Sequence, residues 1–388
     1  MFQILREFKV GKPQMVAGLL LLVFLIQCLW TAKTRAISDL EYRYIASGLP
    51  SAGAQTASAS PLTGWVAALP VRLIPQVRKV ATASIRDALA VPHPWLLRLP
   101  FILFGLWLGS ALWWVARRLF DDDGGYVALA LYCTSPAMIK ISSNIGPEII
   151  LAWSGLGLIY TAIGVAHTLY APPKKWAPRI VILGLSIGFA LATAWWSFTL
   201  VLLAFGYMLY LAPGCRKKVM IVLAGASAIG CLVWAFVYWL TGSAGLGVKA
   251  LLAQKPTLEA VRNLAFALSA QTDGYVLVFL FILALTAYGS WPRARYFGNT
   301  APLLTALIAV LLFSLAPAIR IWDATLGLSF VFIFIGGLAA DFLELKFQRA
   351  LFQQALFQRA IAAFLIACLM LRAVLTVLAL THWAQNPV

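Results

Sequence analysis

The chain has 388 residues, 62% of them hydrophobic, and a mean hydropathy of +0.89. Its repeated apolar runs are about 20 residues long, the length that crosses the hydrocarbon core of a bilayer, which excludes an ordinary soluble domain. Thirty Lys and Arg against thirteen Asp and Glu give a net charge of +17. The basic residues are spread over short loops, so anionic lipid head groups and phosphate-bearing substrates are favoured as partners over nucleic acid.

The first apolar run, Met15 to Trp30, follows three basic residues and is predicted to be a retained signal anchor, because many further spans come after it. Residues 1–388 are therefore expected to form a single integral membrane domain. The predicted fold is an all-α, polytopic transmembrane helical bundle of about eleven spans. The spans are placed near residues 15–32, 96–115, 125–139, 147–168, 179–194, 197–212, 219–240, 273–290, 299–316, 322–343 and 361–381.

A cytoplasmic N-terminus puts the basic clusters between spans on the cytoplasmic side, as the positive-inside rule requires. These clusters are Arg117-Arg118, Lys174-Lys175 with Arg179, Arg216-Lys217-Lys218, Arg293 with Arg295, and Lys346 with Arg349 and Arg359. The C-terminus is then periplasmic, as are a first external loop at 33–95 and a second at 241–272. Short loops and the lack of N-x-S/T acceptor sites indicate a bacterial inner membrane.

The first external loop is expected to contain an amphipathic surface helix. Gly64 to Val80 interleaves apolar residues with Arg72, Arg78 and Lys79, which is typical of a helix lying in the membrane interface. Before it, Ser51 to Ser60 is small and polar and is predicted to be a mobile loop. A second surface helix is predicted within Lys249 to Ala270.

No metal site is predicted. The three histidines are dispersed, and Asp121-Asp122-Asp123 lies beside Arg117 and Arg118, which favours a solvated turn. The five cysteines lack the paired spacing of a metal site or a disulfide framework and are interpreted as small core residues.

Acids outside the cytoplasmic loops are scarce, which directs attention to the stretch Ser38-Asp39-Leu40-Glu41-Tyr42-Arg43-Tyr44 just after the first span. Acidic residues at a membrane interface often mark functional sites. Asp39 and Glu41 are the first candidates for a catalytic base. The alternative is that both merely pair with Arg35 and Arg43 on a solvated loop.

Four further motifs follow in order: Arg98-Leu99-Pro100 through Leu103-Phe104-Gly105, then Ala116-Arg117-Arg118-Leu119-Phe120, Thr134-Ser135-Pro136, and Pro147-Glu148-Ile149-Ile150-Leu151-Ala152. This series resembles the polyprenyl-phosphate-sugar transferases of the GT-C fold, the group that includes the aminoarabinose transferase of lipid A and the protein O-mannosyltransferases. The resemblance is clearest over about a third of the chain, from Asp39 to about Ala166.

The resemblance implies an aspartate-glutamate pair in the first loop, which falls on Leu40 and Glu41, with Asp39 one residue earlier. The family's second acid appears as Glu148, and its late arginine motif appears as Arg320-Ile321-Trp322 with Trp in place of Tyr. A further family segment is reduced to Pro61-Leu62, without its lysine.

The predicted activity is a periplasmic transfer of a sugar from a polyprenyl-phosphate donor to a lipid, glycan or protein acceptor. Such a transfer needs a base and a positively charged phosphate pocket. Asp39, Glu41 and Glu148 are the predicted catalytic acids, with Arg43, Lys140 and Arg320 as phosphate-binding residues. The polyprenyl-phosphate sugar is expected as the donor substrate, and a requirement for a divalent metal is left open. Membrane lipids and membrane proteins are the predicted partners.

Two other functions remain open at this point. Leu40 at the family's acid position also fits a GT-C-fold protein that has lost catalysis and serves as a structural or lipid-binding subunit of a membrane complex. An anionic lipid transporter or flippase is the second alternative. It would be indicated by acidic or basic residues in mid-span and by broken helices in matched halves of the chain.

Overall fold

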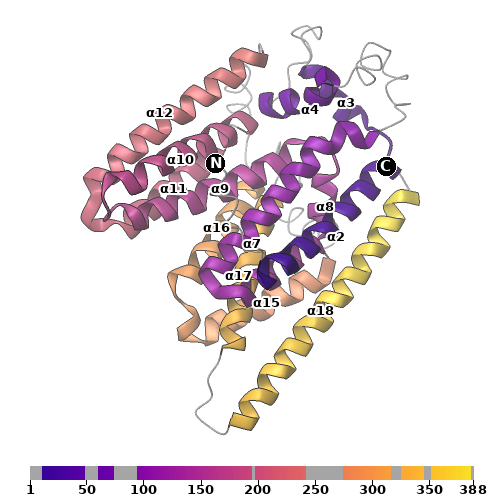
Figure 1. Cartoon of the computed structure of the whole chain (residues 1–388), viewed down its shortest axis with the longest axis vertical. Helices are drawn as coiled ribbons and strands as arrows, with labels where there is room; N and C mark the ends of the chain where they lie inside the picture. The colour runs from indigo at the N-terminus through magenta and orange to yellow at the C-terminus, as the bar shows by residue number, and fades with distance from the viewer. Residues whose placement is uncertain are drawn as a thin grey trace.

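The protein is described by a computed structural model over residues 11–48, 60–73, 94–194, 197–241, 274–315, 325–344 and 351–385. Regular structure in these ranges is entirely helical, which confirms the all-α prediction. Long helices lie side by side in a bundle (Figure 1). In chain order they are α2 (Lys12–Thr34), α3 (Asp39–Ser47), α4 (Pro61–Leu73), α7 (Pro94–Cys133), α8 (Pro136–Ser142), α9 (Pro147–Thr168), α10 (Pro173–Thr193), α11 (Phe198–Leu211), η3 (Pro213–Cys215), α12 (Arg216–Thr241), α15 (Gly274–Ser290), η5 (Pro292–Ala294), α16 (Phe297–Leu315), α17 (Thr325–Leu343) and α18 (Leu351–Gln385).

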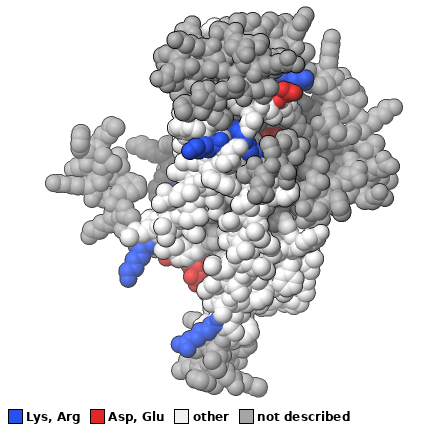
Figure 2. All heavy atoms as spheres, turned by 90° about the vertical axis from the view of Figure 1, so that its right-hand side faces the viewer, with Lys and Arg blue, Asp and Glu red and all other residues white. Residues whose placement is uncertain are grey.

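Six helices in the described part of the chain are long and apolar enough to cross a membrane, and four shorter apolar helices accompany them. On the face in Figure 2, charged side chains form an upper and a lower group, and the described surface between them is largely uncharged. The chain is therefore a multi-span membrane protein. The exact number of spans, the division into external loops and the orientation of the termini stay predictions.

α7 is two antiparallel helices joined by a tight reversal. The backbone leaves helical geometry at Phe120 and Asp121, and Asp121 has a φ of 58°. Beyond the reversal, Tyr132 donates a hydrogen bond of 2.7 Å to the carbonyl of Gly105. Asp122 pairs with Arg117 beside the reversal, in keeping with the turn predicted there.

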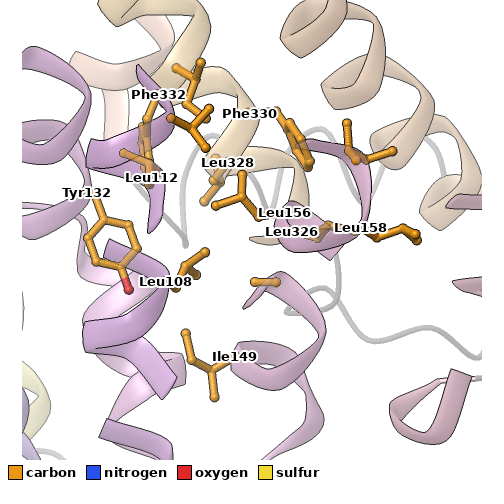
Figure 3. Close-up of a cluster of buried hydrophobic side chains, with 14 of the residues drawn as sticks. Leu108, Leu112, Tyr132, Ile149, Leu156, Leu158, Leu326, Leu328, Phe330 and Phe332 are labelled. Atoms are coloured by element: carbon orange, nitrogen blue, oxygen red, sulfur yellow. The ribbon is translucent and has the colours of Figure 1, made fainter. Parts of the chain in front are cut away.

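The core lies where α7, α9 and α17 meet. Figure 3 shows leucine, isoleucine and aromatic side chains gathered in this interior, among them Leu112, Leu156 and Phe332. α7 and α17 approach closely because both carry glycine there: a Cβ added at Gly336 would lie 2.7 Å from the carbonyl oxygen of Gly124. Small residues commonly allow such close approach between membrane helices.

A helix, α4, lies at Pro61–Leu73 and overlaps the start of the surface helix predicted over Gly64 to Val80, but most of its side chains are buried rather than exposed to a membrane surface. Its small residues allow it to pack against α3, α7 and α12. Residues 74–80, the segment 249–270 and nearly all of 51–60 lie outside the described ranges. Cys28 and Cys133 are core residues as predicted, whereas Cys231 is exposed on α12.

Candidate functional site

The short helix α3 begins with a capping box. The hydroxyl of Ser38 accepts a hydrogen bond of 3.3 Å from the backbone N–H of Glu41, and the Glu41 carboxylate accepts one of 2.9 Å from the backbone N–H of Ser38. Ser followed three residues later by Glu is the sequence signature of this motif. The first turn of α3 therefore has a defined position just after α2.

Glu41 also forms a buried ion pair with Arg98, near the start of α7. The Nε of Arg98 lies 2.8 Å from Oε1 of Glu41, and Nη2 lies 2.7 Å from Oε2. Arg98 is 1% exposed and Glu41 is 4% exposed. This two-point geometry is the strongest arrangement between a guanidinium and a carboxylate.

The remaining N–H groups of Arg98 bind backbone carbonyls at and just after the end of α2. They donate to the carbonyls of Ala32, Arg35 and Ala36, at 2.8 to 2.9 Å. All five guanidinium donors are thus used, and carbonyls at the end of α2 that have no helical partner are satisfied. Arg98 therefore links α2, α3 and α7 in one network.

The carboxylate of Glu41 is fully engaged. Besides Ser38 and Arg98, it accepts a hydrogen bond of 3.0 Å from the backbone N–H of Ile145. Burial alone would raise the pKa of Glu41, but the hydrogen bonds and charge of Arg98 outweigh it and hold the pKa below its ordinary value. A carboxylate held in this way is suited to orienting its neighbours rather than to exchanging protons.

Asp39 and Arg43 lie apart from this buried network. Both are exposed, and they are four residues apart on α3, which places them on the same face of the helix. Leu40, at the family's acid position, is 43% exposed. Glu41 pairs with Arg98, and not with Arg35 or Arg43, so the solvated-loop alternative does not describe it.

Arg35 and Lys140 are partly buried cations that lie near enough to repel each other, and the backbone carbonyl of Arg35 belongs to the network. Arg35 donates a hydrogen bond of 3.1 Å to the side-chain oxygen of Asn144, which follows α8. Burial lowers the pKa of Lys140 to about 8, and repulsion from Arg35 contributes. Burial likewise lowers the pKa of Arg35, with repulsion from Arg98 partly offset by Glu41. An anion bound here would relieve this repulsion.

Glu148 lies in the first turn of α9 and is 8% exposed. Its carboxylate folds back over Gly146, where an added Cβ would collide with it. A negative charge at this position is favoured by the helix dipole. Because Ile145 binds Glu41, the start of α9 is tied to the same network.

The structure therefore brings Glu41, Lys140 and the start of α9 into one region, whereas Arg320 lies outside the described residues. Arg98 and Arg35 were not among the predicted site residues. The usable signal for Arg98 was a lone arginine at the start of an apolar span, where a charge requires a partner. Among the described residues, no group of three or more His, Cys, Asp or Glu could hold a metal ion.

Comparisons with known proteins bear on the family and the fold. The model of the dolichyl-phosphate-mannose-protein mannosyltransferase family matches residues 82–239. No curated protein matches the sequence.

Solved structures match nearly the whole chain. ArnT from Cupriavidus metallidurans in the apo state superposes with a TM-score of 0.64 and 13% identity, covering 95% of this chain and 77% of ArnT. The form bound to undecaprenyl phosphate gives a TM-score of 0.60 and 14% identity, covering 94% and 70%. The oligosaccharyltransferase of Archaeoglobus fulgidus in the apo form gives a TM-score of 0.54 and 12% identity, covering 95% of this chain and 56% of its own. The chain is therefore a membrane protein with the GT-C fold of these glycosyltransferases.

Proposed function

We propose that this protein transfers a sugar from a polyprenyl-phosphate donor to a lipid, glycan or protein acceptor at the periplasmic face. The observation that carries the proposal is that Arg35 and Lys140, two partly buried cations in a GT-C fold, lie near enough to repel each other, and that Asp39 is exposed four residues after Arg35. One protein of this fold has been solved with undecaprenyl phosphate. A lipid phosphate has the charge that this pair of cations requires.

Each candidate residue has a role in this proposal. Asp39 takes the proton from the acceptor hydroxyl or amine as that atom attacks the anomeric carbon. The bond between that carbon and the phosphate oxygen breaks, and the phosphate leaves with the electron pair. Arg35 and Lys140 stabilise the departing phosphate, with Arg43 and Arg320 as further contacts. Attack from the side opposite the phosphate inverts the anomeric carbon.

Glu41 and Glu148 act differently from Asp39 in this proposal. Glu41 is a positioning residue, since its carboxylate is committed to Arg98 and to two backbone N–H groups. It holds α3, and with it Asp39, against the start of α9. Glu148, in the first turn of α9, contributes a second negative charge near the acceptor.

Transfer by purified protein in lipid nanodiscs tests the proposal. Radiolabelled polyprenyl-phosphate sugars serve as donors, and a membrane-lipid extract serves as acceptor. We expect Asp39→Asn to reduce transfer at least ~100-fold, the contribution typical of a general base. Asp122→Asn, at the reversal of α7, is the matched control and should transfer normally. Equal rates for wild type and Asp39→Asn would rule out the role of Asp39.

A GT-C-fold subunit without catalysis is the second candidate, because Leu40 occupies the family's acid position. This function predicts that the purified protein binds polyprenyl phosphate yet transfers nothing from any donor. Binding and transfer measured on the same preparation separate the two functions.

A further inference from the structure

The turn between α7 and α8 exposes backbone carbonyls to other helices. α7 ends at Cys133, and Pro136 has no N–H to donate. The N–H of Ser135 bonds to the carbonyl of Tyr132, three residues back, instead of continuing the helical pattern. The carbonyls of Leu131 and Thr134 accept hydrogen bonds from side chains more than 200 residues later in the chain.

These side chains belong to the C-terminal helix α18. Nη2 of Arg372 donates to the carbonyl of Leu131 at 3.2 Å. The hydroxyl of Thr376 shares its one hydrogen between the carbonyl of Thr134, at 2.6 Å, and that of Arg372 one turn earlier in α18, at 2.8 Å. The guanidinium of Arg372 also lies 5.6 Å from the centre of the Phe332 ring. Arg372 is 2% exposed and Thr376 is fully buried.

Most of α18 has little contact with the rest of the protein. It runs along the edge of the bundle (Figure 1), and only 11% of its apolar window is buried. An arginine within an apolar span is costly, so a leucine would suit a helix whose role is to face lipid. Arg372 and Thr376 are therefore suited to hydrogen-bonding the turn before α8 rather than to facing lipid.

α8 begins directly after this turn and carries Lys140 within its seven residues. We propose that Arg372 and Thr376 are positioning residues that fix the turn and so hold Lys140 beside Arg35. This inference rests on the proposed function, because Lys140 is taken as a ligand of the donor phosphate. α18 would then support the donor site from the opposite end of the sequence.

Paired substitutions at Thr376 test the inference. Thr376→Val removes the hydroxyl at nearly constant volume, and Thr376→Ser keeps it. The control is Thr381→Val, since Thr381 is less buried on α18 and its hydroxyl bonds within that helix. Each variant is placed in phosphatidylcholine nanodiscs for two measurements: the affinity for farnesyl phosphate, and the pH midpoint of amine labelling at Lys140 followed by peptide mass spectrometry.

We expect Thr376→Val to weaken farnesyl phosphate binding about 10-fold, the effect of losing one buried hydrogen bond to a group that aligns a charge. The labelling midpoint of Lys140 should rise from about 8 toward the ordinary lysine value near 10.4, because the amine becomes more hydrated. Thr376→Ser and Thr381→Val should retain both wild-type values. Arg372→Lys keeps the positive charge and Arg372→Met removes it. The same two measurements on this pair test the positioning role of Arg372.

Unchanged affinity and midpoint in Thr376→Val would overturn the positioning role. If wild type fails to bind farnesyl phosphate, the proposed function is contradicted, while the Lys140 midpoint still tests the positioning role. If Arg372→Met does not fold, the conservative Thr376 pair decides the question. A midpoint that shifts equally in Thr381→Val would indicate a general loosening of α18 and would also overturn the inference.

Discussion

Glu41 illustrates how a residue singled out for chemistry can have a structural role. Its carboxylate and Arg98 are buried together, so removing one charge leaves the other without compensation. Loss of one partner from a buried ion pair typically costs about 3–5 kcal/mol. Asp39, two residues away, is exposed and has no such partner within the described part of the chain.

We therefore expect Glu41→Gln to lower the free energy of unfolding by about 3 kcal/mol. Asp39→Asn should change it by less than about 0.5 kcal/mol, as usual for an exposed position. Denaturant titration in detergent micelles, followed by tryptophan fluorescence, measures both. Similar stabilities for the two variants would contradict the anchoring role of Glu41.

The lowered pKa of Lys140 predicts that phosphate binding depends on pH. Its pKa is lowered to about 8 by burial and then by Arg35, so the free protein loses this positive charge as pH rises through 8. Only the protonated amine attracts an anion. Farnesyl phosphate affinity should therefore be greatest below pH 8 and fall above it, as measured by titration calorimetry between pH 6.5 and 9.5.

Lys140→Arg is the matched control for this pH dependence, because arginine stays charged throughout this range. Its affinity should stay nearly constant where that of wild type declines. A decline of the same size in both proteins would assign the pH effect to another group.

The reversal within α7 lets one apolar stretch of the chain form two antiparallel helices. Asp121 takes a φ of 58° and a ψ of −167° there, a conformation that glycine adopts readily and other residues avoid. Asp121 is exposed, and its neighbour Asp122 makes the ion pair with Arg117. The strain at Asp121 is therefore not offset by an ion pair of its own.

We expect Asp121→Gly to stabilise the protein by about 1 kcal/mol, because glycine relieves the strain and loses only part of that gain to its greater freedom when unfolded. Asp121→Ala, which keeps the Cβ, should give no gain. Thermal unfolding of the two variants in the same detergent provides the comparison, and equal melting temperatures would argue against strain at this position.

The molecule as a whole should be oriented with its basic loops in the cytoplasm. This orientation puts Arg43 outside and Arg216 inside. In a variant without native cysteines, a membrane-impermeant maleimide should label Arg43→Cys in spheroplasts and label Arg216→Cys only after permeabilisation. The reverse pattern would place the candidate site on the cytoplasmic side and would contradict the proposed periplasmic transfer.

Much of this architecture follows from local pattern. Apolar runs separated by basic loops predict helices that lie close to those observed, because hydrophobic length and charge act within each segment. The span predicted at 125–139 is an exception, since the helix breaks between Cys133 and Pro136. Ser38 and Glu41 carry the capping signature, so the start of α3 could also be read from the sequence.

Which residues the buried charges contact was decided only by tertiary packing. Glu41 meets Arg98 across 57 residues, and Arg372 meets Leu131 across 241. Hydrophobic periodicity shows which residues must leave water, but a buried charge takes whichever partner the packed helices bring within hydrogen-bond distance. The helices and the polarity of their ends were thus encoded locally. The division of roles between an anchored Glu41 and an exposed Asp39 required the assembled bundle, because both lie on the same short helix and only one faces Arg98.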